Sequence, residues 1–282
     1  MKLSIIIVNW NTRDILKQTI NSVIAETTLF MHEIIVVDNN SNDGSVEMIK
    51  KEFPNVILIE NKINEGFAKG NNRGLKIAKG EYLMLLNSDT IILNHAIEKL
   101  VKFLDENQEV FLIGPKLLNK DGSFQVACRR NLPDIKNSFL YLFSVKKLVK
   151  SDKNYKSNKD ENVSNYCEAI SGAAMMFRSE VYKKIGGLDE QFFMYAEDLD
   201  YCKCVFDQSW KTYYLSEAHI THLGGESTKR RSLKSLYYFY KTMWQYYKKH
   251  LYKNSSLFVN RLVFLGIIIL FLYKSLKKLL FK

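Results

Sequence analysis

The sequence predicts an α/β domain with a mostly parallel, doubly wound sheet. Short apolar runs alternate with stretches of helical spacing, as in consecutive β-α-β units. The runs are typical of strands buried on both faces and lie at 3–8, 34–37, 56–59 and 82–86. In such sheets ligands bind beyond the carboxyl ends of the strands. Polar residues that follow a strand are therefore the first candidates for function.

Local signals mark the boundaries of the predicted helices. Asn11 and Thr12 are placed to cap the first helix, and Gly80 is placed to end a helix predicted over 66–79. Further elements are expected as helices at 46–53, 179–185 and 196–208 and as a strand at 212–215. The polar segment 151–165 predicts a surface loop that could cover the site.

Length and composition favour one cytoplasmic domain with an extension. The 282 residues suit one large α/β domain with a C-terminal extension, or at most two small domains. Four cysteines without metal or disulfide spacing indicate reduced thiols, and the apolar N-terminus lacks a full signal-peptide pattern. The net charge of +11 suits a membrane surface, a phosphorylated substrate or nucleic acid, or reflects a lysine-rich surface alone.

The C-terminal stretch predicts membrane association. Residues 229–252 begin basic and become aromatic, and 262–273 are almost purely apolar and followed by Lys274, Lys277 and Lys278. This run is shorter than the about 20 residues that span a bilayer. We expect a helix that lies in the membrane surface with a basic collar, with packing on the domain or on a partner chain as the alternative.

Carboxylates follow two of the predicted strands. Asp38 ends the second strand, and Asn87, Ser88 and Asp89 follow the fourth. Carboxylates in a crevice hold Mg²⁺ or Mn²⁺ together with substrate phosphates. A diphosphate leaving group needs such a cation because negative charge builds up as its bond breaks. Each aspartate taken alone could equally cap a turn.

The segment 64–74 contains three glycines inside a helical pattern. Each costs about 1 kcal/mol relative to alanine, so their presence indicates that something approaches the backbone closely. The amino end of this helix could also contribute positive potential to a diphosphate.

A cluster of acids and two histidines form the last candidates. Glu197, Asp198 and Asp200 repel one another, and clustered acids with raised pKa values suit a general base; an acidic helix start is the alternative. His219 and His222 follow the strand predicted at 212–215 and could complete a metal shell or be structural.

Taken in order, these motifs resemble glycosyltransferase family 2, whose members have the GT-A fold. The matching segments are 4–11, 36–41, 64–74, 87–89, 172–175, 186–189 and 197–198, with His222. The resemblance therefore implies a glycosyltransferase domain at 1–227, followed by a helical extension at 228–282. The resemblance implies nucleotide binding by Val8, Asn9, Asn11, Asp38, Gly66, Asn72, Asn87, Ser88 and Asp89. It further implies that Asp198 acts as the base beside Glu197, and that Asp89 and His222 hold Mg²⁺ or Mn²⁺.

One position departs from the family pattern. Asn87 stands where the family carries the first residue of its Asp-x-Asp element, so the cation depends on Asp89 and His222. This Asn form resembles the rhamnosyltransferase-like branch, which implies dTDP-rhamnose as the donor, with a UDP-sugar as the alternative.

The implied activity is inverting hexosyl or rhamnosyl transfer to a saccharide or lipid-linked acceptor in cell-surface polysaccharide synthesis. We expect a cytoplasmic enzyme at the inner face of the cell membrane, with no nucleic-acid partner, and allow for a homodimer. A nucleotidyltransferase acting on sugar phosphates would carry a Gly-rich loop with Arg and Lys at 9–12. A non-catalytic nucleotide-sugar-binding protein would not need Asp38, Asp89, Asp198 and His222 together.

Overall fold

The computed structural model describes residues 1–134, 160–224 and 233–280. The first half consists of β1 (Leu3–Asn9), α1 (Arg13–Glu26), β2 (His32–Asp38), α2 (Ser45–Glu52), β3 (Ile57–Glu60), α3 (Phe67–Leu75), β4 (Tyr82–Asn87), β5 (Thr90–Leu93) and α4 (Ala96–Glu106). The second half consists of β6 (Val110–Leu118), η1 (Val126–Cys128), β7 (Arg129–Arg130), β8 (Asn165–Cys167), β9 (Ala169–Ile170), β10 (Ala174–Arg178), α6 (Ser179–Ile185), α7 (Glu197–Asp207), β11 (Lys211–His222), α8 (Leu233–His250), η3 (Tyr252–Asn254) and α9 (Leu257–Leu280).

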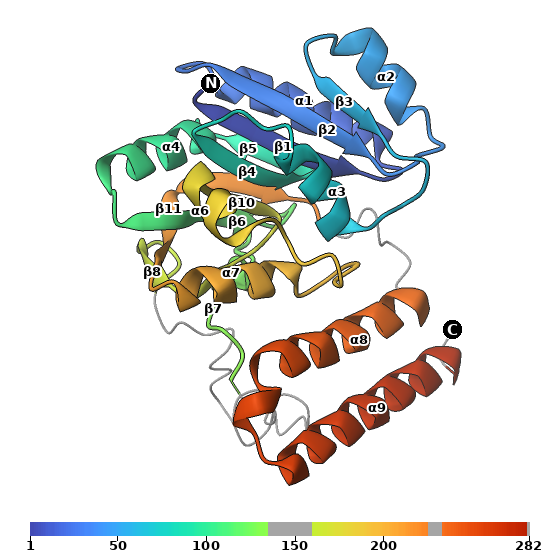
Figure 1. Ribbon diagram of the computed structural model, residues 1–282. Helices are drawn as coiled ribbons and strands as arrows, with labels where there is room; N and C mark the ends of the chain where they lie inside the picture. The colour runs from blue at the N-terminus through green and yellow to red at the C-terminus, as the bar shows by residue number, and fades with distance from the viewer. Residues whose placement is uncertain (135–159, 225–232, 281–282) are drawn as a thin grey trace.

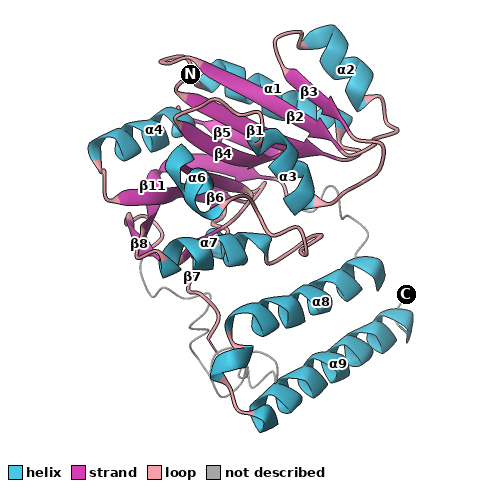
Figure 2. Ribbon diagram, in the orientation of Figure 1, coloured by secondary structure: helices cyan, strands magenta, loops and turns pink. Residues whose placement is uncertain are grey.

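One large sheet forms the centre of the molecule (Figure 2). Its strand order is β3-β2-β1-β4-β10-β6-β11-β5, and β8 pairs with β11. The strands β3, β2, β1 and β4 are parallel, as β-α-β units require. β10 runs antiparallel to both of its neighbours, β4 and β6. The predicted parallel half is therefore confirmed, and a mixed half adjoins it.

Helices cover both faces of this sheet (Figure 1). On one face, Ile20 of α1 and Leu100 of α4 pack with Ile5 of β1 in a continuous core. On the other face, Val205 of α7 belongs to a second core that includes Ile6 of β1. Successive residues of β1 thus point into different cores, which is why this strand is apolar throughout. The doubly wound α/β class is confirmed.

The glycine-rich helix α3 packs closely against β1. A Cβ on Gly70 would lie 2.9 Å from Val8 Cγ1, and a Cβ on Gly74 would lie 2.5 Å from Ile6 Cγ2. Any side chain at these positions would push the helix away from the strand. The close approach that the glycines predicted is real, and at Gly70 and Gly74 the approaching group is the protein's own strand.

One predicted helix end is wrong, and one predicted cap is not made by its side chain. The helix expected over 66–79 ends at Leu75, and Gly80 does not cap it. A Cβ on Gly80 would lie 2.4 Å from the backbone nitrogen of Ser4, so this glycine is required by close packing against β1. Thr12 occupies the N-cap position of α1, but its hydroxyl donates to Asn9 Oδ1 at 2.7 Å and does not cap the helix.

Other boundaries differ by length. The strand predicted at 212–215 is the long β11, which continues to His222. Most of the loop predicted at 151–165, and the proposed boundary between 1–227 and 228–282, lie outside the described residues.

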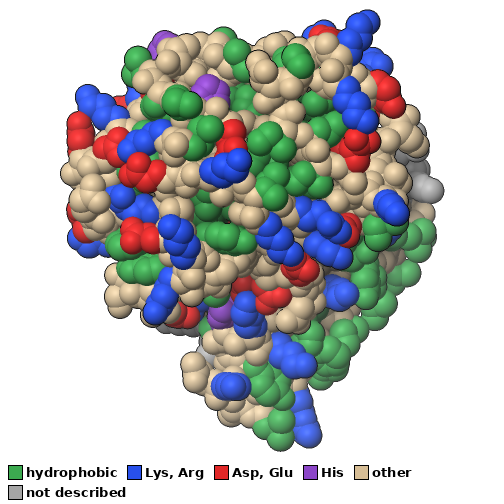
Figure 3. All heavy atoms as spheres, turned by 45° about the horizontal axis from the view of Figure 1, so that its top comes forward, with side chains coloured by type: hydrophobic (Ala, Val, Ile, Leu, Met, Phe, Trp, Pro, Cys, Tyr) green, Lys and Arg blue, Asp and Glu red, His purple; other side chains and the backbone are tan. Residues whose placement is uncertain are grey.

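The C-terminal helices α8 and α9 lie side by side below the sheet domain (Figure 1) and share their own apolar cluster. α9 has 24 residues. The most apolar stretch of 18 residues within it has a mean hydropathy of 2.0, and 22% of that stretch is buried. By length and composition it is sufficient to cross a membrane. The expectation that this segment is too short is therefore wrong, because the helix continues beyond the run 262–273 on both sides. Apolar side chains, with Lys or Arg side chains among them, gather at the lower right edge of Figure 3.

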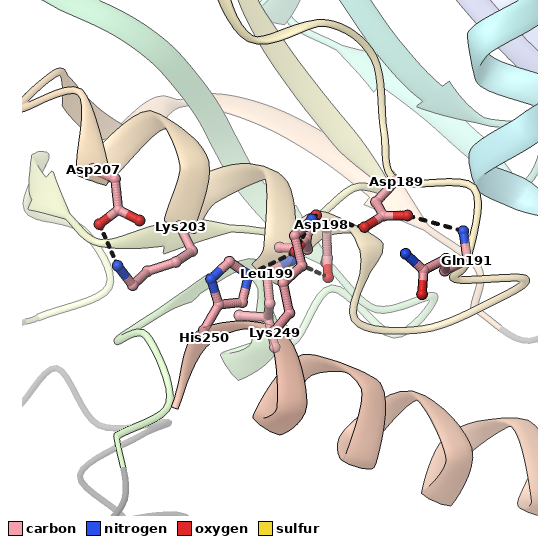
Figure 4. Close-up of polar contacts among 9 residues, drawn as sticks. Asp189, Gln191, Asp198, Leu199, Lys203, Asp207, Lys249 and His250 are labelled. Atoms are coloured by element: carbon pink, nitrogen blue, oxygen red, sulfur yellow. Dashed lines mark hydrogen bonds and ion pairs between the residues drawn. The ribbon is translucent and has the colours of Figure 1, made fainter. Parts of the chain in front are cut away.

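A cluster of ion pairs fastens α8 to α7 (Figure 4). Oδ1 of the buried Asp200 in α7 lies 2.8 Å from Lys249 Nζ and 2.6 Å from His250 Nε2. Lys249 also reaches Asp189 Oδ2 at 2.7 Å. The end of α8 is thus joined directly to the helix that begins with Glu197 and Asp198.

Candidate active site

A cleft with a volume of about 280 Å³ lies beyond the carboxyl ends of β1 and β4. Its walls come from these strand ends, the turn before α3, the start of α7 and the end of β11. Eight of the predicted site residues line it: Val8, Gly66, Asn87, Ser88, Asp89, Glu197, Asp198 and His222. The fold therefore brings together segments that are distant in the sequence, at the edge that the topology rule indicates.

Asn9 and Asp38 lie behind the wall of the cleft. They face each other in the register of β1 and β2, and Asn9 Nδ2 donates to Asp38 Oδ1 at 2.8 Å. The backbone nitrogen of Ser41 donates to Asp38 Oδ2 at 2.8 Å. The Asp38 side chain is engaged in fixing this turn, and the neighbouring Asn39 lines the cleft instead.

Asn72 and Asn11 also lie outside the cleft wall. Asn72 Nδ2 donates to the carbonyl of Leu188 at 2.8 Å, and the Leu188 nitrogen donates back to Asn72 Oδ1 at 2.8 Å. This pair fastens α3 to the chain that leads to α7. Asn11 is exposed, and its Oδ1 accepts from the backbone nitrogen of Asn42 at 2.8 Å.

Asp89 and His222 form the candidate cation site. His222 Nε2 lies 3.3 Å from Asp89 Oδ1 and 3.1 Å from Asn87 Nδ2. His222 Nδ1 lies 3.0 Å from Gln125 Oε1. A proton on Nδ1 would donate to Gln125 and leave the Nε2 lone pair to accept from Asn87 Nδ2. The same lone pair, beside Asp89, is the one that a metal ion would bind, as in other histidines oriented by a second hydrogen bond.

Asp89 and His222 fit a cation whose coordination shell is completed by the substrate. Within 1–134, 160–224 and 233–280 there is no group of three or more His, Cys, Asp or Glu side chains that could hold a metal ion. Mg²⁺ commonly takes only one or two carboxylates and completes its shell with phosphate oxygens and water. Asp89 and His222 therefore match a shared protein–diphosphate site and not a closed protein cage.

The start of α7 places two acids with different environments. Tyr195 and Ala196 precede the helix with φ values of 73° and 64°, a left-handed backbone that is costly for residues other than glycine. Asp198 Oδ2 accepts from Arg130 Nη2 at 2.5 Å and from the backbone nitrogen of Gly172 at 3.1 Å. These contacts fix the position of the Asp198 carboxyl group at the start of α7.

Glu197 differs from its neighbour. Its side chain is buried, and Oε2 has no hydrogen-bond partner in the part of the chain that the structure describes. Burial, followed by repulsion from Asp198, raises the pKa of Glu197 to about 8. At neutral pH Glu197 carries a proton. The raised pKa expected of this acidic cluster falls on Glu197.

Sequence reasoning missed two residues that shape this site. Arg130 of β7 pairs with Asp198, and Gln125 orients His222. The two adjacent arginines, Arg129 and Arg130, are conspicuous in the sequence, but nothing in it indicates which acid they pair with. No sequence pattern distinguishes Gln125. Both act over separations of 68 and 97 residues, which only the folded chain reveals.

The sheet topology and the polar cleft at its parallel strand ends define a GT-A domain. The family model described as Glycosyl transferase family 2 matches residues 4–186. The chain belongs to this family, as the sequence motifs predicted.

Three comparisons illustrate the relationship. The chain is 33% identical over 141 residues to a poly(ribitol-phosphate) beta-glucosyltransferase of Bacillus spizizenii, covering 48% of this chain and 22% of that protein. It is 23% identical over 210 residues to the N-acetylglucosaminyl-diphospho-decaprenol L-rhamnosyltransferase of Mycobacterium tuberculosis, covering 70% and 68%. The mannosyltransferase PcManGT of Pyrobaculum calidifontis, solved with GDP-Man and Mn²⁺, superposes with a TM-score of 0.60 at 14% identity, covering 94% and 68%. The chain thus spans less than a quarter of the length of the Bacillus relative.

Proposed function

We propose that the protein is an inverting glycosyltransferase that moves a hexosyl or rhamnosyl group from a nucleotide-diphosphate donor to a saccharide or lipid-linked acceptor. The observation that carries this proposal is that Asp198 lines the same cleft as Asp89 and His222. One cleft therefore offers a carboxylate for an incoming hydroxyl and ligands for a departing diphosphate. The named activities of the Bacillus and Mycobacterium relatives support the class of reaction.

The donor would lie along the ends of β1 and β4. We assign Val8, Gly66, Asn87 and Ser88 to its contact surface, and Asp89 and His222 to the ligands of Mg²⁺ or Mn²⁺. A bound cation would neutralise charge on the leaving diphosphate. The supporting residues Asn9, Asn11, Asp38 and Asn72 would act by fixing the loops that carry this surface. The donor is dTDP-rhamnose or a UDP-sugar in this proposal.

Asp198 would act on the acceptor. Its carboxylate takes the proton of an acceptor hydroxyl while that oxygen forms a bond to the anomeric carbon. The bond from this carbon to the diphosphate breaks at the same time, so the configuration at the anomeric carbon inverts. Glu197 is protonated at neutral pH and therefore adds no second negative charge beside the attacking oxygen. Its side chain would shape the acceptor side of the cleft.

The reaction would take place at the inner face of the cell membrane during synthesis of a cell-surface polysaccharide. The length and composition of α9 support membrane contact, and Lys274, Lys277 and Lys278 suit an anionic surface. Two relatives carry lipid-diphosphate acceptors in their names, with decaprenol and undecaprenol as the lipids.

Replacing Asp198 with Asn tests the central assignment. We expect kcat for sugar transfer to fall by about 10²- to 10⁴-fold, because a general base contributes about that much. Nucleotide affinity, measured by calorimetry with UDP and dTDP in the presence of Mn²⁺, should stay unchanged. Asp207→Asn at the exposed end of the same helix is the matched control and should transfer normally. Full transfer by Asp198→Asn would show that another group is the base.

A further inference from the structure

We infer that an apolar cavity between the start of α7 and the helices α8 and α9 binds the hydrocarbon chain of a lipid-diphosphate acceptor. The inference rests on the proposed function, because it names the acceptor that the same site would use. It adds a binding subsite to which the helices α8 and α9 (the C-terminal hairpin) contribute. Both helices lie beyond the residues 4–186 matched by the family model.

The cavity has the size and lining of a small-molecule site. Its volume is about 340 Å³, within the range of about 300–1,000 Å³ for ligand pockets. The apolar walls come from α8, from α9 and from the residue that follows α8: Phe239, Met243, Val263, Ile267 and Leu251. An apolar chain bound here would be removed from water on several sides, at about 25 cal/mol per Å² of apolar surface buried.

This cavity adjoins the catalytic cleft and shares part of its wall with it. Tyr195, Glu197 and Asp198 line both spaces. A molecule that filled the apolar cavity would therefore hold its polar end beside the proposed base. Such a molecule has a long apolar part joined directly to a polar head that bears the accepting sugar.

The polar groups on the cavity wall suit a phosphate at the junction of head and chain. Arg130 supplies a guanidinium to this wall. The Tyr246 hydroxyl and Glu197 Oε2 are buried here without hydrogen-bond partners among the described residues. Leaving such a group unpaired costs about 1–3 kcal/mol, so a ligand that pairs with it binds with that advantage. Tyr246 and protonated Glu197 can both donate to phosphate oxygens.

The position of α9 gives the lipid a path to the bilayer. Val263 and Ile267 face the cavity, whereas Leu265 and Ile269 on the same helix are 51% and 61% exposed. One face of α9 thus closes the cavity, and its other apolar face is free to contact membrane. Because the helix that lines the cavity also presents this apolar surface, a lipid chain suits the cavity better than a soluble apolar ligand.

Binding of a fluorescent prenyl diphosphate to the full-length protein tests the inference without requiring transfer. We expect saturable binding with a higher affinity than the wild type has for methyl diphosphate. Ile267→Trp on α9 and Met243→Trp on α8 should fill the cavity and weaken binding at least tenfold. Ile269→Trp places the same side chain on the outer face of α9 and should bind as the wild type does.

The outcomes separate this inference from the proposed function. Unfolding curves establish which variants are folded, and Met243→Trp decides if Ile267→Trp is not. Equal affinity of wild type, Ile267→Trp and Met243→Trp for the prenyl probe would overturn the lipid subsite. Equal affinity of the wild type for prenyl and methyl diphosphate would overturn it as well. Failure of the proposed function would instead appear as absent UDP and dTDP binding and absent transfer, whatever the prenyl probe does.

Discussion

The proposed donor side and the proposed acceptor side of the cleft are built differently. On the donor side, the polar side chains behind the strand ends have partners from neighbouring strands and turns, as in the contacts of Asn9 and Asp38. On the acceptor side, α7 follows two residues with left-handed backbone, and Glu197 Oε2 and the Tyr246 hydroxyl are unpaired within the described part of the chain. The polar side chains behind the donor side are therefore paired before any substrate binds, whereas buried groups on the acceptor side have hydrogen-bonding capacity left over.

This difference indicates where binding free energy comes from. A surface whose polar groups are already fixed recognises its ligand with little reorganisation. A surface with buried, unpaired groups loses stability in the free protein and regains it when a ligand supplies partners. The acceptor side is therefore expected to be the less stable half, and its stability should respond to pH and to conservative substitutions.

Glu197→Gln should give the largest effect. Folded Glu197 keeps its proton up to about pH 8, whereas the unfolded group releases it near its ordinary value of 4.5. The wild type therefore loses stability as pH rises from about 4.5 to about 8, by at most about 1.4 kcal/mol per pH unit. Gln mimics the protonated acid, so urea unfolding should show an advantage of several kcal/mol at pH 8 that vanishes near pH 4.5.

Glu180→Gln is the control for this experiment, since Glu180 is largely exposed on α6. Its stability difference from the wild type should not change with pH. A pH-independent difference for Glu197→Gln would show that Glu197 ionises normally and that the acceptor side is no less complete than the donor side.

Asp38→Ala tests the other half of the comparison and should cost about 3 kcal/mol. The substitution removes a buried acceptor and leaves the donors of Asn9 and Ser41 short of a partner. Urea unfolding should show the loss, and nucleotide affinity should fall because the turn that carries Asn39 into the cleft loosens. Asp14→Ala, at an exposed pair with Arg13, should change neither quantity.

The same division separates what the sequence could predict from what it could not. The parallel strands and their polar ends were predictable, because an apolar run buried on both faces and the residue that ends it are local signals. Family resemblance then identified Asp89, Asp198 and His222, all of which line the cleft. Asp38 and Asn72 were also identified, but their side chains are engaged in fixing loops.

The acceptor side depends on contacts that no local pattern carries. Tyr246 belongs to the aromatic helix α8, and no sequence pattern predicts that this helix lies beside α7. The glycines of α3 signalled close approach, but only the packing identified β1 as the neighbour. The length of α9 was underestimated because the apolar run was taken alone, whereas flanking leucines and lysines also favour helix.

Tyr246→Phe should give the smallest effect and the most informative sign. In the free protein the hydroxyl has no partner among the residues described, so its removal should leave the free energy of unfolding unchanged or raise it by up to about 1 kcal/mol. Tyr240→Phe removes a hydroxyl from the same helix at a position outside the lining of the cavity and controls for the general effect of such a change. A loss of about 1 kcal/mol or more in Tyr246→Phe alone would mean that the hydroxyl is already hydrogen-bonded in the free protein. The acceptor side would then be as complete as the donor side, and the contrast between the two would rest on Glu197 alone.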